Sequence, residues 1–187
     1  MPADDIPELT PEQLAEIERE FDPETAFRST GKTVGYIIAA ILVSMSVYHF
    51  YASGFGLVRE LVHRGIHLSF VLGLVFLLFG ARKANYSLSP KAWYRVEGVP
   101  MIDIIFALVA VSAAMYLPLL PAEALAKRVG NPSPTDIFMG SALLLLTLEA
   151  ARRSVGPTLP IIGLVFIGFA YFGPLMPGAL KHGGASW

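Results

Sequence analysis

Long runs without a charged residue are the feature that most limits what this chain can fold into. The four longest are Thr33–Val58, Gly65–Ala81, Ile104–Ala122 and Ser154–Leu180, of 26, 17, 19 and 27 residues. A helix rises about 1.5 Å per residue, so about 20 apolar residues cross a hydrocarbon core roughly 30 Å thick. Because a segment in lipid must satisfy its own backbone polar groups, we expect these runs to be transmembrane helices.

The other fold that spans membranes, a β-barrel, is disfavoured by the pattern of the runs. Barrel strands have about 9–11 residues in which apolar and polar side chains alternate. Residues 70–79 read Phe-Val-Leu-Gly-Leu-Val-Phe-Leu-Leu-Phe and do not alternate. Only 16% of the residues are charged, against about a quarter in soluble domains. We therefore predict an all-α integral membrane protein.

The charges divide the chain into three predicted parts. Residues 1–32, which hold 9 of the 15 acidic residues, form a soluble N-terminal segment. Residues 33–180 form the transmembrane helical bundle, and residues 181–187 form a short C-terminal tail. The acidic start lacks the basic region and apolar core of a cleavable signal, so the first transmembrane helix is expected to direct insertion.

The soluble segment is predicted to contain an amphipathic helix. Thr10 is the expected N-cap, and Pro11 suits the first helical position. Apolar residues then recur at helical spacing on one face of an otherwise acidic helix. They are Leu14, Ile17 and Phe21.

Glycine, proline and charged residues divide the bundle into about five transmembrane helices. These run roughly over residues 34–51, 66–80, 101–117, 136–153 and 159–172. The loop 84–100 between the second and third spans is predicted to hold an interfacial helix, because its Trp93–Tyr94 pair lies among cations. For residues 136–172 the sequence leaves open two full spans, a kinked pair and a re-entrant hairpin.

The distribution of basic residues predicts the orientation. If the five spans alternate, 9 lysines and arginines fall on the side of the N-terminus and 5 on the opposite side. Cytoplasmic loops carry the excess of basic residues, so the N-terminus is expected in the cytoplasm.

Charged residues within or at the edge of the spans are the first candidates for a functional site. Glu149 precedes Arg152 by three residues and Arg153 by four, so ion pairs within one helix are expected. These pairs could temper charge at the membrane edge, or the three residues could contact a partner. Asp103 and Asp136 each begin a span, where helix capping is the expected role, and Thr135 or Asp136 is the predicted cap of the fourth span.

The histidines raise the question of a cofactor. His63 and His67 are four residues apart on one helical face, and His49 is expected on the same side of the membrane. They could ligate haem or a metal ion, or they could be ordinary interfacial histidines. The chain has no cysteine, which excludes disulfides and thiolate metal sites. Because it contains no recognisable nucleophile or phosphate-binding motif, we predict no enzymatic activity.

Polar groups in the middle of the spans are few. A substrate pathway requires inward polar residues or broken helices at the midplane. The first three spans offer only serines that suit helix packing: Ser44, Ser46, Ser69 and Ser112. Such helices make a poor transporter alone but a reasonable wall or clamp for a larger one.

A series of short motifs occurs in a fixed order between about residues 20 and 182. The motifs are Asp22-Pro-Glu24, Arg64-Gly-Ile-His-Leu68, Asn131-Pro-Ser-Pro-Thr-Asp136, Glu149-Ala-Ala-Arg-Arg153, Gly156-Pro-Thr-Leu-Pro160 and Tyr171-Phe-Gly-Pro174. In this order and spacing they resemble the small-membrane-subunit part of TRAP transporters of the TAXI type, which is commonly fused to the large transport subunit.

The resemblance implies a scaffold role in a bacterial or archaeal cytoplasmic membrane. In such systems an extracytoplasmic solute-binding protein delivers substrate to a large elevator-type subunit driven by a sodium gradient, and the small subunit braces it. The resemblance thus implies the lipid bilayer and the large subunit as direct partners and the solute-binding protein as an indirect one. It implies no nucleic acid, no cofactor in this chain, and sodium ions in the large subunit.

Two questions stay open at this point. Fused members continue where this chain ends at Trp187, so a separate subunit, a split gene and a part of a fused permease are all compatible with the sequence. The alternative function is a haem- or metal-bearing membrane anchor of an oxidoreductase, for which His49, His63 and His67 would be the ligands.

Overall fold

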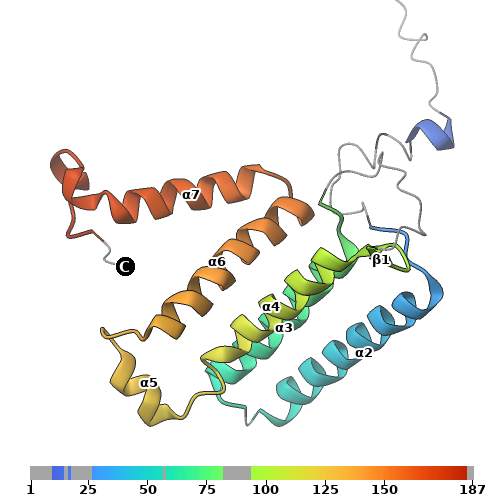
Figure 1. The fold of residues 1–187 in the computed structure, drawn as a ribbon, viewed down its shortest axis with the longest axis horizontal. Coiled ribbons are helices and arrows are strands. Elements are labelled where there is room, and N and C mark those ends of the chain that lie inside the picture. The colour runs from blue at the N-terminus through green and yellow to red at the C-terminus, as the bar shows by residue number, and fades with distance from the viewer. Residues whose placement is uncertain (1–9, 15–16, 18–26, 57, 82–93, 185–187) are drawn as a thin grey trace, which may run out of the picture.

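The computed structural model describes residues 10–14, 17, 27–56, 58–81 and 94–184, and its fold is a set of helices with one short hairpin (Figure 1). The helices and strands are, in order, α2 (Lys32–Phe55), α3 (Glu60–Leu78), β1 (Arg95–Val96), β2 (Val99–Pro100), α4 (Met101–Tyr116), α5 (Ala122–Arg128), α6 (Pro134–Ser154) and α7 (Thr158–Tyr171). Two short 3-10 turns follow, η2 (Gly173–Leu175) and η3 (Gly178–Leu180).

Three of the helices are long and apolar enough to cross a membrane. These are α2, α3 and α6, of 24, 19 and 21 residues. The helices α4 and α7 are apolar but shorter, with 16 and 14 residues. The prediction of a helical chain with segments long and apolar enough to span a membrane is thus confirmed, and the number of five spans stays a prediction.

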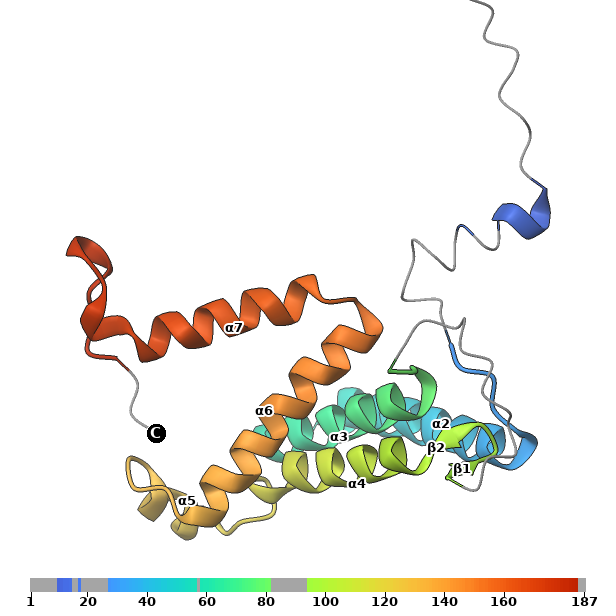
Figure 2. The same ribbon diagram turned by 45° about the horizontal axis from the view of Figure 1, so that its top comes forward.

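The core lies where α3, α4 and α6 pack together. Figure 2 shows α3 and α4 side by side, with α6 crossing them. After the loop that follows α6, α7 points away from this core. Apart from Asp103, the buried residues of α4 are alanines at helical spacing, so the neighbouring helices can approach closely. The core cluster consists of Leu72 and Phe76 from α3, Ala107 and Ala110 from α4, and Leu146 and Ala150 from α6.

The first half of α3 lies tightly against the end of α4 at Gly65. A Cβ atom built on this glycine would lie 2.4 Å from Pro118 Cγ and 3.1 Å from the backbone oxygen of Ala114. No side chain fits between these backbones. In contrast, a Cβ at Gly73 on the same helix would lie 3.4 Å from a Val111 methyl, at ordinary contact distance.

The segment before α4 is a β-hairpin. The interfacial helix predicted around the Trp93–Tyr94 pair falls mainly on residues 82–93, which lie outside the described part of the chain, so it stays a prediction. Glu97 and Gly98 form its two-residue turn with φ angles of 46° and 94°. Positive φ at both central positions is typical of the type I′ turn, whose twist matches that of the two strands. Glycine is required at the second position because the backbone oxygen of Ser29 lies 2.8 Å from where a Cβ would be.

This hairpin supplies the cap that α2 lacks in its own sequence. The N-cap residue of α2 is Gly31, which has no side chain to accept a hydrogen bond. Instead the Glu97 carboxylate accepts the Val34 N–H at 2.9 Å, and the Glu97 carbonyl accepts the Gly31 N–H at 2.8 Å. A negative charge at a helix N-terminus is favourable, so the hairpin fixes the start of α2.

Two helix starts show capping boxes. At the N-terminal helix the Gln13 N–H donates to Thr10 Oγ1 and the Thr10 N–H donates to Gln13 Oε1, which confirms Thr10 as the cap. Ser133 caps α6, with Pro134 at the first helical position and Asp136 closing the box. The prediction of Thr135 or Asp136 as that cap is wrong by two or three residues, because Asp136 acts from the third helical position.

We expect Gly65→Val to destabilise the fold strongly. The added side chain must push apart the backbones of α3 and α4, and such overpacking costs about 1–3 kcal/mol. Thermal unfolding in mild detergent measures the change. Gly73→Ala is the matched control on the same helix and should leave the midpoint nearly unchanged. Equal midpoints for Gly65→Val and wild type would contradict the close packing.

Glu97 predicts a stability that depends on acid pH. Hydrogen bonds with the Thr33 side chain and the Val34 N–H lower the pKa of its carboxyl below the ordinary value of 4.5. The folded pKa is thus below the unfolded one, so the stabilisation is complete above that ordinary value and is lost as pH falls through the folded pKa. Glu97→Gln should lower the unfolding midpoint at about pH 7 and converge with wild type towards about pH 3. A difference independent of pH would contradict this role.

Candidate functional site

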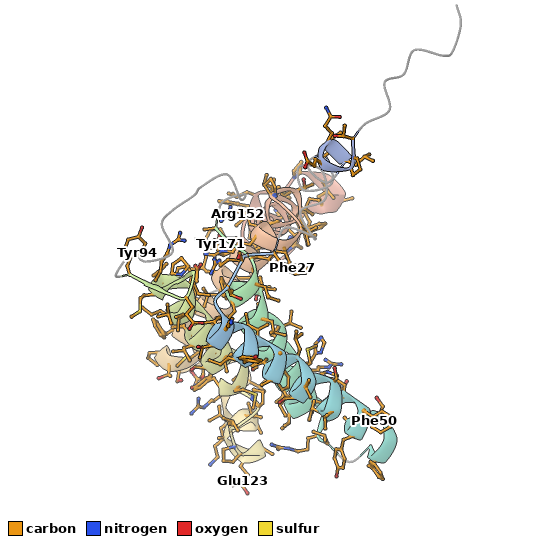
Figure 3. The ribbon with its side chains drawn as sticks, turned by 90° about the vertical axis from the view of Figure 1, so that its right-hand side faces the viewer. Phe27, Phe50, Tyr94, Glu123, Arg152 and Tyr171 are labelled. Carbon is orange, nitrogen blue, oxygen red and sulfur yellow. The ribbon has the colours of Figure 1, made fainter. Side chains whose placement is uncertain are left out.

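Four segments that are distant in the sequence meet at one end of the bundle. They are the stretch before α2, the end of α3, the start of α4 and the end of α6 (Figure 1). Figure 3 labels Phe27 and Arg152 at this end, whereas Phe50 and Glu123 lie at the other. The meeting point contains three arginines and two carboxylates, which we call the arginine–carboxylate network: Arg28, Asp103, Glu149, Arg152 and Arg153.

Asp103 is the centre of this network. Its side chain is 2% exposed, and each carboxylate oxygen accepts from a different arginine. Arg28 Nη2 donates to Oδ2 at 2.5 Å, and Arg153 Nη1 donates to Oδ1 at 2.8 Å. The predicted capping role is wrong, because no side chain caps α4 and Asp103 pairs with two distant segments instead. Its place in the first turn of α4 is still favourable for an anion.

Arg153 is buried and faces the core. Its side chain is 2% exposed, and its guanidinium lies 5.0 Å from the ring centroid of Phe76 and 5.8 Å from that of Phe106. Arg153 Nε also donates to Glu149 Oε1 at 2.7 Å, which confirms the predicted pair within the helix. The residue therefore links Asp103, Glu149 and two aromatic rings, and its side chain is not accessible from outside.

Arg152 is the accessible member of the predicted trio. Its Nε and Nη2 donate to the two oxygens of Glu149 at 2.7 and 2.8 Å, which confirms the second predicted pair. Its Nη2 also donates to the Ala81 carbonyl at 3.0 Å. With its side chain 41% exposed, Arg152 presents a positive charge at the surface, held in place by Glu149.

The three arginines also satisfy carbonyls at the C-terminal end of α3. The Phe79 carbonyl accepts from Arg28 Nη2 at 3.2 Å and from Arg153 Nη1 at 3.5 Å, next to the Ala81 carbonyl that Arg152 binds. The last carbonyls of a helix lack partners and carry partial negative charge, so cations there are stabilising. The network is in this way also the C-terminal cap of α3.

The charges of the network decide what it can do. Its three arginines and two carboxylates leave one positive charge in excess, and arginine does not deprotonate in proteins. This composition suits a permanent clamp between helices. Removing one partner of a buried ion pair leaves an uncompensated charge, which costs about 3–5 kcal/mol.

A second polar cluster lies at the other end of α6. Asp136 Oδ1 accepts from Arg128 Nη1 at 2.6 Å and from the Tyr116 hydroxyl at 2.8 Å. The cluster thereby joins the ends of α4 and α5 to the start of α6. The hydrogen bond to Asp136, together with that to Tyr116, raises the pKa of the Arg128 guanidinium, so the pair stays charged.

The structure brings the three predicted histidines together. His49 of α2 lies with its ring centroid 5.0 Å from that of His67 and 5.5 Å from that of His63, both on α3. Across the residues that the structure describes, no group of three His, Asp or Glu side chains is arranged to hold a metal ion.

Sequence reasoning missed Arg28 and the role of Asp103. Both were visible as charges near apolar runs. However, Arg28 lies 75 residues before Asp103 in the chain, and Arg153 lies 50 residues after it. The local pairs of Glu149 were found because they lie within one helical turn. Comparison with known proteins adds nothing to the site, since no family model, curated protein or solved structure matches the chain.

We expect Asp103→Asn to destabilise the fold by about 3–5 kcal/mol, because Arg28 and Arg153 would remain buried without a counter-charge. Thermal unfolding in detergent measures the loss. The control is Glu60→Gln, which removes the carboxylate of an exposed pair with Arg64 and should cost no more than about 1 kcal/mol. Similar losses in the two variants would show that Asp103 is not the centre of the network.

Proposed function

We propose that this chain is a small scaffold subunit of a TAXI-type TRAP transporter. In this role it crosses a bacterial or archaeal cytoplasmic membrane about five times, with its N-terminus in the cytoplasm, and braces a large elevator-type subunit during sodium-coupled solute uptake. The proposal draws on the ordered motif series between about residues 20 and 182. The chain itself carries no catalytic step in this proposal.

The observation that carries the proposal is how the apolar helices satisfy their polar side chains. Among the described residues, five hydroxyls within the helices donate to a carbonyl one turn back in the same helix. They are Ser44 to Ala40, Ser69 to Gly65, Ser112 to Leu108, Thr147 to Leu143 and Ser154 to Ala150. Such back-bonded hydroxyls satisfy themselves within one helix. They therefore suit walls and packing faces better than a pathway for a polar solute.

The placement of charge supports the same role. In the helices α2 to α7 of the described chain, the charged residues lie within the first or last two turns or in α5, and most are paired. A transport site would place polar groups near the bilayer midplane. Rigid pairs at both ends and apolar surfaces between them are suited to holding helices in a fixed arrangement.

The exposed apolar faces of α7 and α2 are the surfaces that a partner helix could contact. Pro160 is the only buried residue of α7, while Ile161, Val165 and Phe166 are exposed. The outer face of α2 is exposed in the same way. In a membrane these faces contact lipid or other helices, and a large multi-span subunit is the partner that the proposal assigns to them.

Within the candidate partner-contact trio, we assign the contact itself to Arg152. Glu149 and Arg153 are the residues that position it, since Arg153 is buried and Glu149 binds both arginines. An exposed arginine held in one orientation is a suitable donor for a carboxylate or carbonyl of a neighbouring chain.

The test of the proposal is a pull-down of the tagged chain from native membranes in mild detergent, with partners identified by mass spectrometry. Recovery of a large multi-span permease is the expected result. Recovery of a redox enzyme with a coloured sample would favour the alternative, a haem- or metal-bearing oxidoreductase anchor. Sodium-driven uptake by the chain alone in vesicles would contradict a purely scaffolding role.

We expect Arg152→Gln to weaken capture of the partner about tenfold while leaving the chain folded, because one charge-assisted hydrogen bond contributes about 1.5 kcal/mol. The measurement is partner yield at matched expression, with thermal unfolding as the check on folding. Arg64→Gln is the matched control, since Arg64 is also an exposed arginine in an ion pair within one helix, at the opposite end. Equal yield from Arg152→Gln and wild type would remove Arg152 from the interface.

A further inference from the structure

The end of the bundle opposite the arginine–carboxylate network contains a contact made of imidazoles. His49 Nε2 of α2 lies 2.9 Å from His67 Nδ1 of α3. Beside this pair, the Tyr48 hydroxyl lies 3.1 Å from His63 Nδ1, and the Tyr48 ring is stacked on the His63 ring. These two hydrogen bonds join the far half of α2 to the first turns of α3.

The hydrogen-bond partners fix where the protons lie. His49 Nδ1 is 2.7 Å from the Met45 carbonyl, which can only accept, so Nδ1 carries a hydrogen. In neutral His49 the Nε2 atom is then an acceptor, and His67 Nδ1 must be the donor. If His49 is protonated instead, its Nε2–H donates to His67 Nδ1. Each arrangement has one proton between the two rings.

A second proton is incompatible with this contact. If both rings are imidazolium ions, two N–H groups point at each other across a 2.9 Å gap and the bond becomes a repulsion. No carboxylate among the described residues forms a hydrogen bond or ion pair with His49, His63 or His67. The nearby charged groups on α3 are Glu60 and Arg64, which pair with each other, and Arg59 donates to the Pro118 carbonyl of the α4 end.

The far half of α2 has little apolar packing to replace the bond. The buried residues of α2 are Val34 and Ile38, in its first half. Beyond Met45 the apolar side chains Val47, Phe50 and Tyr51 are exposed. The polar contacts of Tyr48 and His49 are therefore the principal attachment of this half to α3.

We propose that His49 and His67 form an acid-sensitive latch between α2 and α3. The latch is closed while one proton lies between the two rings, and it opens when both rings are protonated. The far half of α2 then keeps only the Tyr48 contacts with His63 and Phe70 and moves further from α3, while its first half stays fixed by the Glu97 cap and the Val34 and Ile38 packing. The latch does not depend on the scaffold role proposed above.

Because the chain has no cysteine, two introduced cysteines are its only thiols and can be labelled specifically. Spin labels at Val47→Cys on α2 and Leu108→Cys on α4, both exposed positions, report the separation of α2 from the core. Pulsed electron paramagnetic resonance measures the distance between the labels in nanodiscs with chelator present. The distance distributions are compared at about pH 8 and about pH 5, on either side of the range in which imidazole ordinarily titrates. We expect a longer and broader distance distribution at the lower pH.

Control variants make the outcome decisive. With His67→Gln, whose side chain does not titrate, the distribution should no longer change with pH; His49→Gln is the second variant if the first does not match wild type at high pH. His182→Gln should keep the wild-type response, because His182 bonds the Phe169 carbonyl far from the latch.

A second label pair, Leu108→Cys with Leu145→Cys on α6, should be insensitive to pH. A wild-type distribution that does not change with pH, or a response that persists in both latch variants, would overturn the proposal.

Discussion

The buried carboxylate of Asp103 is the interaction on which the rest of the structure depends. A single anion at the start of α4 binds arginines from the stretch before α2 and from the end of α6, and those arginines also bind the last carbonyls of α3. Four segments are thus held by groups that cannot be separated without leaving a buried charge unpaired. Apolar packing between helices in lipid is not directional, so this network fixes which helix ends meet.

The two ends of the bundle are built from different chemistry. At one end, permanently charged arginines hold α3, α4 and α6 together. At the other end, α2 is joined to α3 by a hydrogen bond between two imidazole rings. In α2 only Val34 and Ile38 are buried, and the attachments of its far half include imidazole rings. A rigid core with one adjustable helix is compatible with the proposed scaffold role.

The candidate site divides cleanly into a part that local sequence reveals and a part that it does not. Glu149 with Arg152 and Arg153 was predictable, because residues three and four apart on a helix are neighbours whatever the fold. The same spacing does not tell that Arg153 points into the core and Arg152 to the surface. Asp103 has the sequence context of a helix cap, and only the approach of Arg28 and Arg153 makes it the centre of a network.

The sequence by itself determined the helical class with segments long enough to span a membrane, the breaks between helices and the Thr10 cap. Apolar length, proline and glycine breaks and capping boxes all act within a single stretch of chain. Only the tertiary structure decided the cap of α2 by Glu97, the close contact at Gly65 and the partners of Asp103. The short α5 helix also went unpredicted, although Ala-Glu-Ala-Leu-Ala-Lys consists of strong helix formers. Each of the three tertiary features joins residues far apart in the chain, and their geometry exists only once the helices have packed.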